Sequence, residues 1–478
     1  MNYSIIRYIL AWVLKFQAAF LLLPCIVSII YKESEGISFF ITALICLAIG
    51  LMGTSKKPET QMFFAKEGFI IVALSWIIMG VTGALPFVIN GDIPNFTDAL
   101  FETISGFTTT GASILSDVEA LSYSSLFWRS FTHWVGGMGV IVFILAIMPM
   151  TGGHNVHLLR AESPGPSVGK LVPRLRQTAK ILYVIYFVMT LAEIIMLLIA
   201  GMPMFDSLTT AFGTAGTGGF GIKNSSIGDY SATIQWIVTI FMMLFGINFN
   251  AYYFLLGKNK SNFFKIDEVR WYIIIIAVST AIIAFNILPM FDSVSDAVLK
   301  SAFQVGSVIT TTGFSTANFD LWPELSKTLL LLLMFCGACA GSTGGGIKVS
   351  RIIILLKSVA TEIQQFIHPR SVKVIQMDGQ ALPVGTRKGV GIFFLTYILI
   401  FVSSTVLLSI QNFGMVTSFT ATLATLNNIG PGLELVGPTM NYGMFSAFSK
   451  YVLIFNMLAG RLELYPLLLL FAPSVWKK

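Results

Sequence analysis

Long hydrophobic segments separated by short polar ones run along almost the whole of this chain. A helix needs about 20 mostly apolar residues to cross a bilayer, and ten segments meet or approach that length. The pattern therefore predicts an all-α integral membrane protein with ten spans. The first span is expected to remain as a helix, because it lacks the small-residue cleavage site of a signal peptide. The predicted spans lie near residues 7–30, 37–53, 68–90, 127–149, 180–201, 233–256, 271–290, 327–357, 388–411 and 448–472.

Four polar stretches, each centred on a glycine, interrupt this hydrophobic pattern. They are FTTTG at 107–111, GTAGTGGF at 213–220, ITTTGF at 309–314 and NNIGPG at 427–432. The apolar segments before them, such as 98–107 and 296–309, are short. At about 1.5 Å per residue they reach only halfway across a bilayer. We therefore expect re-entrant helices, with Thr97 as a helix N-cap and Asp98 in the first turn.

The same unit of span, short segment, glycine loop and span occurs four times, after two additional N-terminal spans. Phe101 precedes Gly111 by ten residues, and Phe303 precedes Gly313 by the same separation. Such internal repetition predicts a fourfold pseudo-symmetric arrangement around one axis. The expected units are two N-terminal helices at 1–67 and four repeats at 68–150, 151–257, 258–357 and 358–478.

The glycine loops are predicted to line a central pore for cations. Irregular backbone at membrane depth is tolerated only where it is buried or lines a water-filled path. Glycine permits positive φ, so successive carbonyl oxygens can point the same way and replace the hydration shell of a cation. The C-terminal ends of the short helices add partial negative charge. The alternative is that Gly and Thr serve only as packing residues. A packing role alone would explain one such loop better than it explains four loops at matched positions.

The second loop differs from the first and third because it contains TGGF at 217–220 in place of a Thr-Thr-Thr-Gly sequence. The sequence leaves open by one residue how the carbonyl groups of this loop align with those of the other loops. We assign Gly219 as the equivalent of Gly111. The candidate selectivity-filter residues are Thr109, Thr110, Gly111, Thr217, Gly218, Gly219, Thr311, Thr312, Gly313, Asn428, Ile429 and Gly430.

Composition and charge support this picture and orient it. Hydrophobic residues make up 55% of the chain and charged ones only 11%, against about a quarter charged in soluble proteins. Basic residues fall on alternate connections, which places those connections and both termini in the cytoplasm. They include Lys56, Lys57, Lys66, Arg160, Lys170, Arg174, Arg176, Lys180, Lys258, Lys260, Lys265, Arg270, Arg351, Lys357, Arg370, Lys373, Arg387, Lys388, Lys477 and Lys478.

The opposite side, which holds the four glycine loops, carries more acids than bases. An acidic outer surface concentrates cations, although simple avoidance of positive charge outside explains the same bias equally well. The acids on this side include Asp98, Glu102, Asp117, Asp206, Asp292, Asp296 and Glu434.

A run of small residues, GACAGSTGGGIK at 337–348, interrupts the eighth span. It is not a phosphate-binding loop, because Ile347 separates Gly346 from Lys348 and the context is a membrane span. Such a run lets a helix unwind, which suits a movable gate below a pore. We expect this loop to act with Arg461. The candidate gate residues are Gly341, Ser342, Thr343, Gly344, Gly345, Gly346, Lys348 and Arg461.

Two charged residues lie inside predicted spans, where a charge is costly unless it faces water or a partner. Arg461 either faces the pore, where it would oppose cation flow, or pairs with a buried acid such as Glu463. Residues two apart on a helix point to different sides, which favours the pore. Glu193 is expected to belong to a buried pair.

No enzyme chemistry is indicated. The sequence contains no nucleophile–base constellation and implies no covalently bound cofactor. Cys336 and Cys339 form an isolated CxxC inside an apolar run, and His154 and His157 form an isolated HxxH. Neither has the additional ligands that a metal site needs. Membrane lipid is an expected partner, and nucleic acid is not.

Several motifs together resemble the TrkH type of the Trk/Ktr/HKT superfamily of potassium transporters. They are HWVGGMG at 133–139, RAESPGP at 160–166, GACAGSTGGGIKV at 337–349, ATLNNIGPGL at 424–433 and NMLAGRLELY at 456–465. The resemblance implies potassium uptake across the bacterial inner membrane, with K⁺ bound at the candidate filter residues. It also implies a homodimer with one pore per subunit and a cytosolic TrkA-type ring that binds the nucleotide, ATP/ADP or NAD(H). In such proteins the loop equivalent to 337–348 obstructs the path beneath the filter.

An H⁺- or Na⁺-coupled secondary potassium carrier is the alternative to a gated pore. Carriers of that kind show two repeats with broken helices and a site at the membrane midplane, whereas this sequence has four loops on one side. The sequence leaves channel and coupled carrier (a symport) open.

Overall fold

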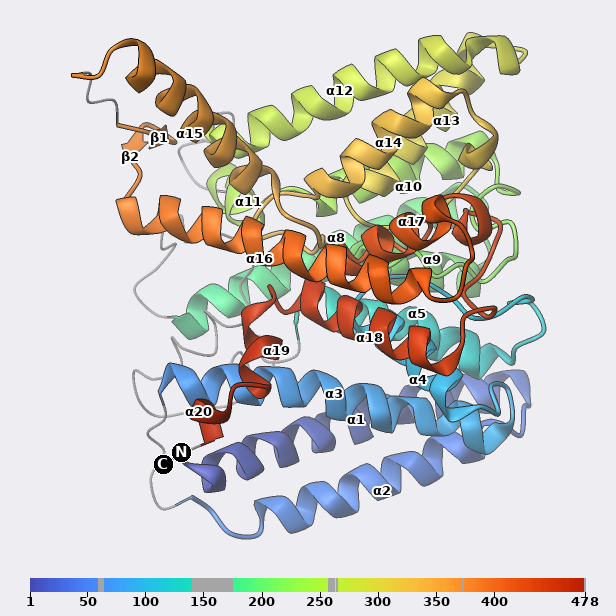
Figure 1. The fold of residues 1–478 in the computed structure, drawn as a ribbon. Coiled ribbons are helices and arrows are strands. Elements are labelled where there is room, and N and C mark those ends of the chain that lie inside the picture. The colour runs from blue at the N-terminus through green and yellow to red at the C-terminus, as the bar shows by residue number, and fades with distance from the viewer. Residues whose placement is uncertain (59–63, 140–174, 257–262, 264, 371–373, 477–478) are drawn as a thin grey trace.

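The protein is a bundle of helices that run broadly side by side (Figure 1). The computed structural model describes residues 1–58, 64–139, 175–256, 263, 265–370 and 374–476. Within that part of the chain the only strands are β1 (Gln376–Met377) and β2 (Gln380–Ala381), which form a small antiparallel hairpin. The structure is therefore mostly helical, as the sequence predicts.

Six helices in the described part are long and apolar enough to cross a membrane. Many of their outward-facing side chains are large and hydrophobic, as with Phe285, which is 82% exposed. Such a surface is stable in contact with lipid rather than water. The chain is thus embedded in a membrane through α1 (Tyr3–Tyr31), α2 (Gly36–Thr54), α3 (Ala65–Asn90), α8 (Leu175–Ile199), α12 (Asp267–Ile287) and α16 (Val384–Ser409).

Four shorter helices each end at one of the glycine loops. They are α4 (Phe96–Phe107), α9 (Met204–Gly216), α13 (Val294–Ile309) and α17 (Met415–Leu426). The N-cap of α4 is Asn95, whose side chain accepts hydrogen bonds from the backbone N–H groups of Thr97 (2.8 Å) and Asp98 (3.4 Å). The expected N-cap at Thr97 is therefore wrong, because Asn95, two residues earlier, accepts from the backbone N–H groups at the start of the helix that have no partner within it. Asp98 does lie in the first turn.

The helices that follow the glycine loops also stop short of a full span. They are α5 (Tyr123–Gly137), α10 (Ala232–Phe245), α14 (Glu324–Cys336) and α18 (Ala447–Arg461). The predicted continuous spans 233–256 and 448–472 are therefore wrong. The first breaks before α11 (Phe249–Leu256), and the second continues as α19 (Tyr465–Leu470) and α20 (Pro473–Trp476). Residues 140–149 of the predicted span 127–149 lie outside the described residues.

In α5 and α18, a glycine near the end of the helix lets it approach the neighbouring backbone. A Cβ placed on Gly136 would meet the carbonyl oxygen of Phe107, the last residue of α4. A Cβ on Gly460 would likewise meet the carbonyl of Leu426, the last residue of α17. Glycine thus permits a backbone approach that any side chain would block.

The remaining elements lie around this bundle. The helix α15 (Val349–Ile367) extends beyond it next to the β1–β2 hairpin (Figure 1). Short 3₁₀ turns occur at η2 (Leu288–Met290), η3 (Phe319–Leu321) and η4 (Glu434–Val436). The Tyr3 hydroxyl donates to the Trp476 carbonyl oxygen at 3.3 Å. The two described ends of the chain therefore lie on the same side of the bundle.

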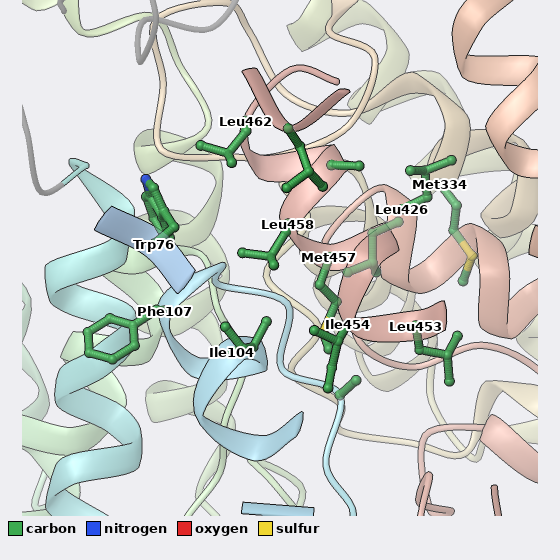
Figure 2. Packing of buried hydrophobic residues seen from close by; sticks show 14 of the residues in the cluster. Trp76, Ile104, Phe107, Met334, Leu426, Leu453, Ile454, Met457, Leu458 and Leu462 are labelled. Carbon is green, nitrogen blue, oxygen red and sulfur yellow. The ribbon is translucent and has the colours of Figure 1, made fainter. Parts of the chain in front are cut away.

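Part of the hydrophobic core lies where α18 packs between two of the short helices, α4 and α17. Figure 2 shows Met457 and Leu458 of α18 between Ile104 of α4 and Leu426 of α17. These four side chains are all almost completely buried. Packing at the density of a protein interior holds the short helices against α18, and it fixes where their C-terminal ends point.

The close approach at Gly460 predicts a stability effect. Gly460→Ala should lower the melting temperature by several degrees, because the methyl group would displace the Leu426 carbonyl and overpacking costs about 1–3 kcal/mol. Gly389→Ala is the matched control: it also lies in a helix, and a Cβ there meets nothing within 4 Å. Thermal unfolding of both variants in detergent is the measurement. Equal melting temperatures would contradict this packing.

Candidate functional site

The four glycine loops share one backbone conformation. The residue two before each central glycine has positive φ: 55° at Thr109, 53° at Thr217, 58° at Thr311 and 55° at Asn428. The central glycines have φ values of 76° at Gly111, 78° at Gly219, 85° at Gly313 and 96° at Gly430. Four non-glycine residues in this strained region require strong support from their surroundings. The pattern also gives Gly219 the same place in its loop as the other three glycines.

Each central glycine lies against the backbone of the next loop. A Cβ on Gly111 would meet the Gly218 carbonyl oxygen, and one on Gly219 would meet that of Thr312. A Cβ on Gly313 would meet the Ile429 carbonyl, and one on Gly430 would meet that of Thr110. The contacts run from loop one to two, to three, to four and back to one. The loops thus form a closed cycle, and only glycine fits at the contact positions.

Within the first loop, and again within the third, two buried threonine hydroxyl groups lie at hydrogen-bond distance from each other. The Thr108 and Thr110 hydroxyls lie 2.8 Å apart, and those of Thr310 and Thr312 lie 2.7 Å apart. The fourth loop is joined to the first because the Asn428 amide donates to the Thr110 hydroxyl at 2.9 Å. All these side chains are completely buried. The Thr108 and Thr310 hydroxyls also donate to the helix carbonyls of Ile104 and Gly306, both at 2.7 Å, so these hydroxyls do not need the loop carbonyls as acceptors.

The segment 337–348 lies directly against two of these loops. The Gly345 N–H donates to the Thr311 hydroxyl at 2.6 Å. A Cβ on Gly344 would meet the Thr310 carbonyl, and one on Gly345 would meet that of Asn427. Small residues are therefore needed for contact with the glycine loops, as well as for the break in the helix.

Arg461 connects this segment to the first repeat. Its guanidinium donates to the Thr343 carbonyl at 2.8 Å and to the carbonyls of Gly136 and Gly137 at 2.5 Å and 2.7 Å. The same group lies 5.9 Å from the centre of the Trp76 ring. Charge-assisted bonds of this kind are about twice as strong as neutral ones. Arg461 thus holds 337–348 against the end of α5.

Other charged groups anchor the two ends of 337–348. Glu268, at the start of α12, accepts hydrogen bonds from the Ala340 N–H at 2.7 Å and the Ser350 N–H at 3.0 Å. Lys348 donates to the Gly344 carbonyl within the segment. Glu463 forms an ion pair with Arg351 rather than with Arg461. The assumption that Arg461 and Glu463 lie on one helix is wrong, because α18 ends at Arg461 and Glu463 has positive φ.

Two acids differ from what the sequence suggested. Glu102 was expected at the outer surface, but it is completely buried and pairs with Arg129 at 2.8 Å. Glu193 was expected in a buried pair. It is completely buried, but its carboxylate oxygens accept no hydrogen bond among the described residues. The Thr214 hydroxyl is near it, but donates to the Thr210 carbonyl at 2.9 Å.

Three buried ionisable residues, Arg129, His133 and Glu268, were not among the functional candidates predicted from the sequence. A usable signal existed for two of them: Arg129 and His133 are four residues apart inside a predicted span, and ionisable residues there are functional candidates by default. Glu268 gave no such signal, because an acid near the start of a span is common. Within the described residues, no group of three His, Cys, Asp or Glu side chains could hold a metal ion. His154 and His157 lie outside those residues.

Comparisons with known proteins bear on the whole chain. Residues 35–478 match the TrkH family, described as "Cation transport protein". The chain is 37% identical to the Trk system potassium uptake protein TrkH of Salmonella typhimurium, with 100% of both chains covered. It is 38% identical to the protein of the same name from Vibrio parahaemolyticus, with 99% of each covered. The crystal structure of the potassium transporter TrkH from Vibrio parahaemolyticus matches with a TM-score of 0.90 at 35% identity, covering 100% of both chains.

Proposed function

Because this chain belongs to the TrkH family of cation transport proteins, we propose that it takes up potassium ions through a pore formed by the four glycine loops. The pore would be surrounded by four pseudo-symmetric repeats at 68–150, 151–257, 258–357 and 358–478, with the two helices of 1–67 outside them. The relatives carry the words "potassium uptake protein" in their names. They are transporters rather than enzymes, and catalysis has no place in the proposal.

The observation that carries this proposal is the closed cycle of glycine–carbonyl contacts. In it, one carbonyl from each loop, of Thr110, Gly218, Thr312 and Ile429, lies against the central glycine of a neighbouring loop. A ring of backbone carbonyls replaces the hydration shell of a K⁺ ion without any carboxylate. The four short helices end at these loops, so their C-terminal partial charges add to the attraction for a cation. The remaining filter residues are the positive-φ residues and glycines of the same loops.

We propose that the segment 337–348 closes the path beneath the filter and that Arg461 keeps it closed. The segment touches Thr310 and Thr311 of the third loop and Asn427 at the start of the fourth, and Arg461 holds its Thr343 carbonyl. A guanidinium on the ion path also repels a cation. Opening requires the segment to leave its contacts with Thr311 and Arg461, while Glu268 retains the two ends.

A cytosolic TrkA-type ring that binds ATP/ADP or NAD(H) is the proposed source of the opening signal. The start of α12, the far end of α15 and the start of α16 lie toward the end of the bundle that carries both described chain ends (Figure 1). Exposed basic residues occur in or next to these segments, among them Lys265, Arg370, Arg387 and Lys388. By the positive-inside rule this end faces the cytoplasm, here inside the bacterial inner membrane. The proposal includes a homodimer with one pore per subunit. No observation on the described residues favours the H⁺- or Na⁺-coupled carrier.

The filter assignment predicts the effect of a side chain at the contact position. Gly313→Ser should reduce the K⁺/Na⁺ permeability ratio about tenfold, or about 1.4 kcal/mol of discrimination, because the added atoms would displace the Ile429 carbonyl. Purified protein in liposomes under K⁺ and Na⁺ gradients gives this ratio. Gly201→Ser is the matched control: Gly201 also has positive φ, and a Cβ there meets nothing within 4 Å. A wild-type protein without K⁺ flux would contradict the proposed function.

The gate assignment predicts a gain of flux. Arg461→Ala should raise ⁸⁶Rb⁺ uptake per folded protein about tenfold, since three hydrogen bonds from a charged donor are lost. Partial deletion of 341–346 should raise it further. Arg461→Lys keeps the positive charge but loses the planar guanidinium with its several donors. An increase in ⁸⁶Rb⁺ uptake smaller than that of Arg461→Ala is therefore expected. Lower uptake together with poor folding would instead assign Arg461 a structural role.

The partner proposal predicts binding at the basic end. Cytosolic TrkA-type protein should bind the purified transporter, and the double substitution Arg387→Glu/Lys388→Glu should weaken binding. Lys32→Glu serves as a control, because Lys32 is exposed just after α1, at the other end of that helix. Surface plasmon resonance at two salt concentrations is the measurement, since such contacts are screened by salt. Equal affinity of all three proteins would contradict docking at this surface.

A further inference from the structure

The second glycine loop lacks the internal support that the first and third possess. In those loops, threonines three and one residues before the central glycine share a hydrogen bond. The corresponding positions of the second loop are Gly216 and Gly218, which have no side chains. Yet Thr217 and Gly219 adopt the same positive φ as their counterparts. Backbone bonds from the Thr217 and Gly218 N–H groups close the end of α9, as in the other loops. The Thr217 hydroxyl donates only to the adjacent Gly216 carbonyl, at 2.6 Å, so further side-chain support for this loop must come from outside it.

The ring of His133, from α5, occupies the space beside Gly218. A Cβ on Gly218 would meet the His133 ring, and one on Gly216 would meet the His133 backbone. The imidazole Nε2 lies 3.1 Å from the Phe220 backbone nitrogen, and Nδ1 lies 2.7 Å from the Gly106 carbonyl oxygen. A backbone N–H can only donate, so Nε2 accepts, and Nδ1–H donates to the carbonyl. The neutral imidazole ring thus connects the C-terminal end of α4, which precedes the first loop, to the second loop.

Arg129 lies one helical turn before His133 and contacts the same region. Its guanidinium lies 4.1 Å from the centre of the Phe220 ring and donates to the Gly221 carbonyl at 3.2 Å. It also donates to Glu102 at 2.8 Å. Both charged side chains are almost completely buried. The i, i+4 spacing puts Arg129 and His133 on one face of α5.

Glu102 extends this connection back to the first loop. Its carboxylate accepts from the Ser113 hydroxyl at 2.9 Å and from the Ile114 N–H at 3.0 Å, just beyond Gly111. The chain of contacts therefore runs from the exit of the first loop, through Glu102 and Arg129, to the exit of the second. A buried ion pair adds little net stability over apolar packing. Its fixed geometry, however, suits the positioning of neighbouring groups.

We infer that Glu102, Arg129 and His133 form a brace that positions the second loop and so determines ion selectivity at the boundary between the first two repeats. The brace replaces the threonine hydroxyls that the second loop lacks. The inference rests on the proposed potassium pore and adds a positioning role for three residues that do not face the ion. The Gly218 carbonyl, which lies against Gly111, is the group whose place the brace fixes.

Two substitutions at His133 separate its two hydrogen bonds. In Gln the side-chain amide reaches the position of Nε2 and can accept from Phe220; in Asn it reaches only the position of Nδ1 and serves Gly106. His133→Asn should therefore lower the K⁺/Na⁺ permeability ratio about tenfold, the effect of one lost buried hydrogen bond. His133→Gln should retain most of the ratio. Reversal potentials in planar bilayers give the ratio independently of protein amount.

Arg129→Lys provides a second, independent variant. The lysine ammonium keeps a positive charge beside Glu102, but it lacks the planar guanidinium that contacts the Gly221 carbonyl and the carboxylate at the same time. Arg129→Lys should therefore lower the K⁺/Na⁺ permeability ratio as His133→Asn does. Thermal unfolding is recorded for every variant. If His133→Asn and Arg129→Lys both fold and keep the wild-type permeability ratio, the inference is overturned. It is also overturned if neither variant folds, because the three residues would then serve only the stability of the fold. A wild-type protein without K⁺ preference would instead remove the proposed pore.

Discussion

The contact between a glycine and the carbonyl group of the next loop is the constraint on which the rest of the structure depends. It occurs four times, and each occurrence needs a residue with positive φ and no side chain. The loops can meet in this way only if the short helices before them stop partway through the bundle, and if the helices after them pass close to those ends. Gly136 and Gly460 permit that approach. The apolar core around α18 then fixes two of the short helices, α4 and α17, and thereby the first and fourth loops that follow them.

The same constraint accounts for what lies beneath the loops. The helices α5, α10, α14 and α18 end below the ring, so their last carbonyls and the following backbone need partners at membrane depth. The segment 337–348 and Arg461 supply many of them. Cys339 N–H bonds to the Gly246 carbonyl, Phe249 N–H to Gly341, and Arg461 to Gly136 and Gly137. A segment held by hydrogen bonds, with few large side chains, exchanges partners at lower cost than a packed helix. This is the physical basis for assigning it the movable part of the proposed pore.

Much of this arrangement was predictable from local sequence signals. Gly111, Gly219, Gly313 and Gly430 mark the loops because only glycine suits positive φ at a crowded place, and the small residues of 337–348 mark a break. The errors came from long-range geometry. A hydropathy pattern does not distinguish one helix from two separated by a turn, so the ends at Phe245 and Arg461 were missed. Nor does it pair Glu102 with Arg129 within the first repeat, or place His133 of that repeat against Gly218 of the second, because these partners meet only in the folded chain.

The central claim is that a cation binds on the axis of the four loops, between the carbonyls of Thr110, Gly218, Thr312 and Ile429. The most direct measurement is a crystal structure of the protein grown in Tl⁺, a K⁺ analogue that scatters anomalously. The account predicts the strongest anomalous peak inside the ring, in contact with one carbonyl from each loop. A strongest peak elsewhere in the bundle, such as beside the buried Glu193 carboxyl, with none inside the ring, would contradict it.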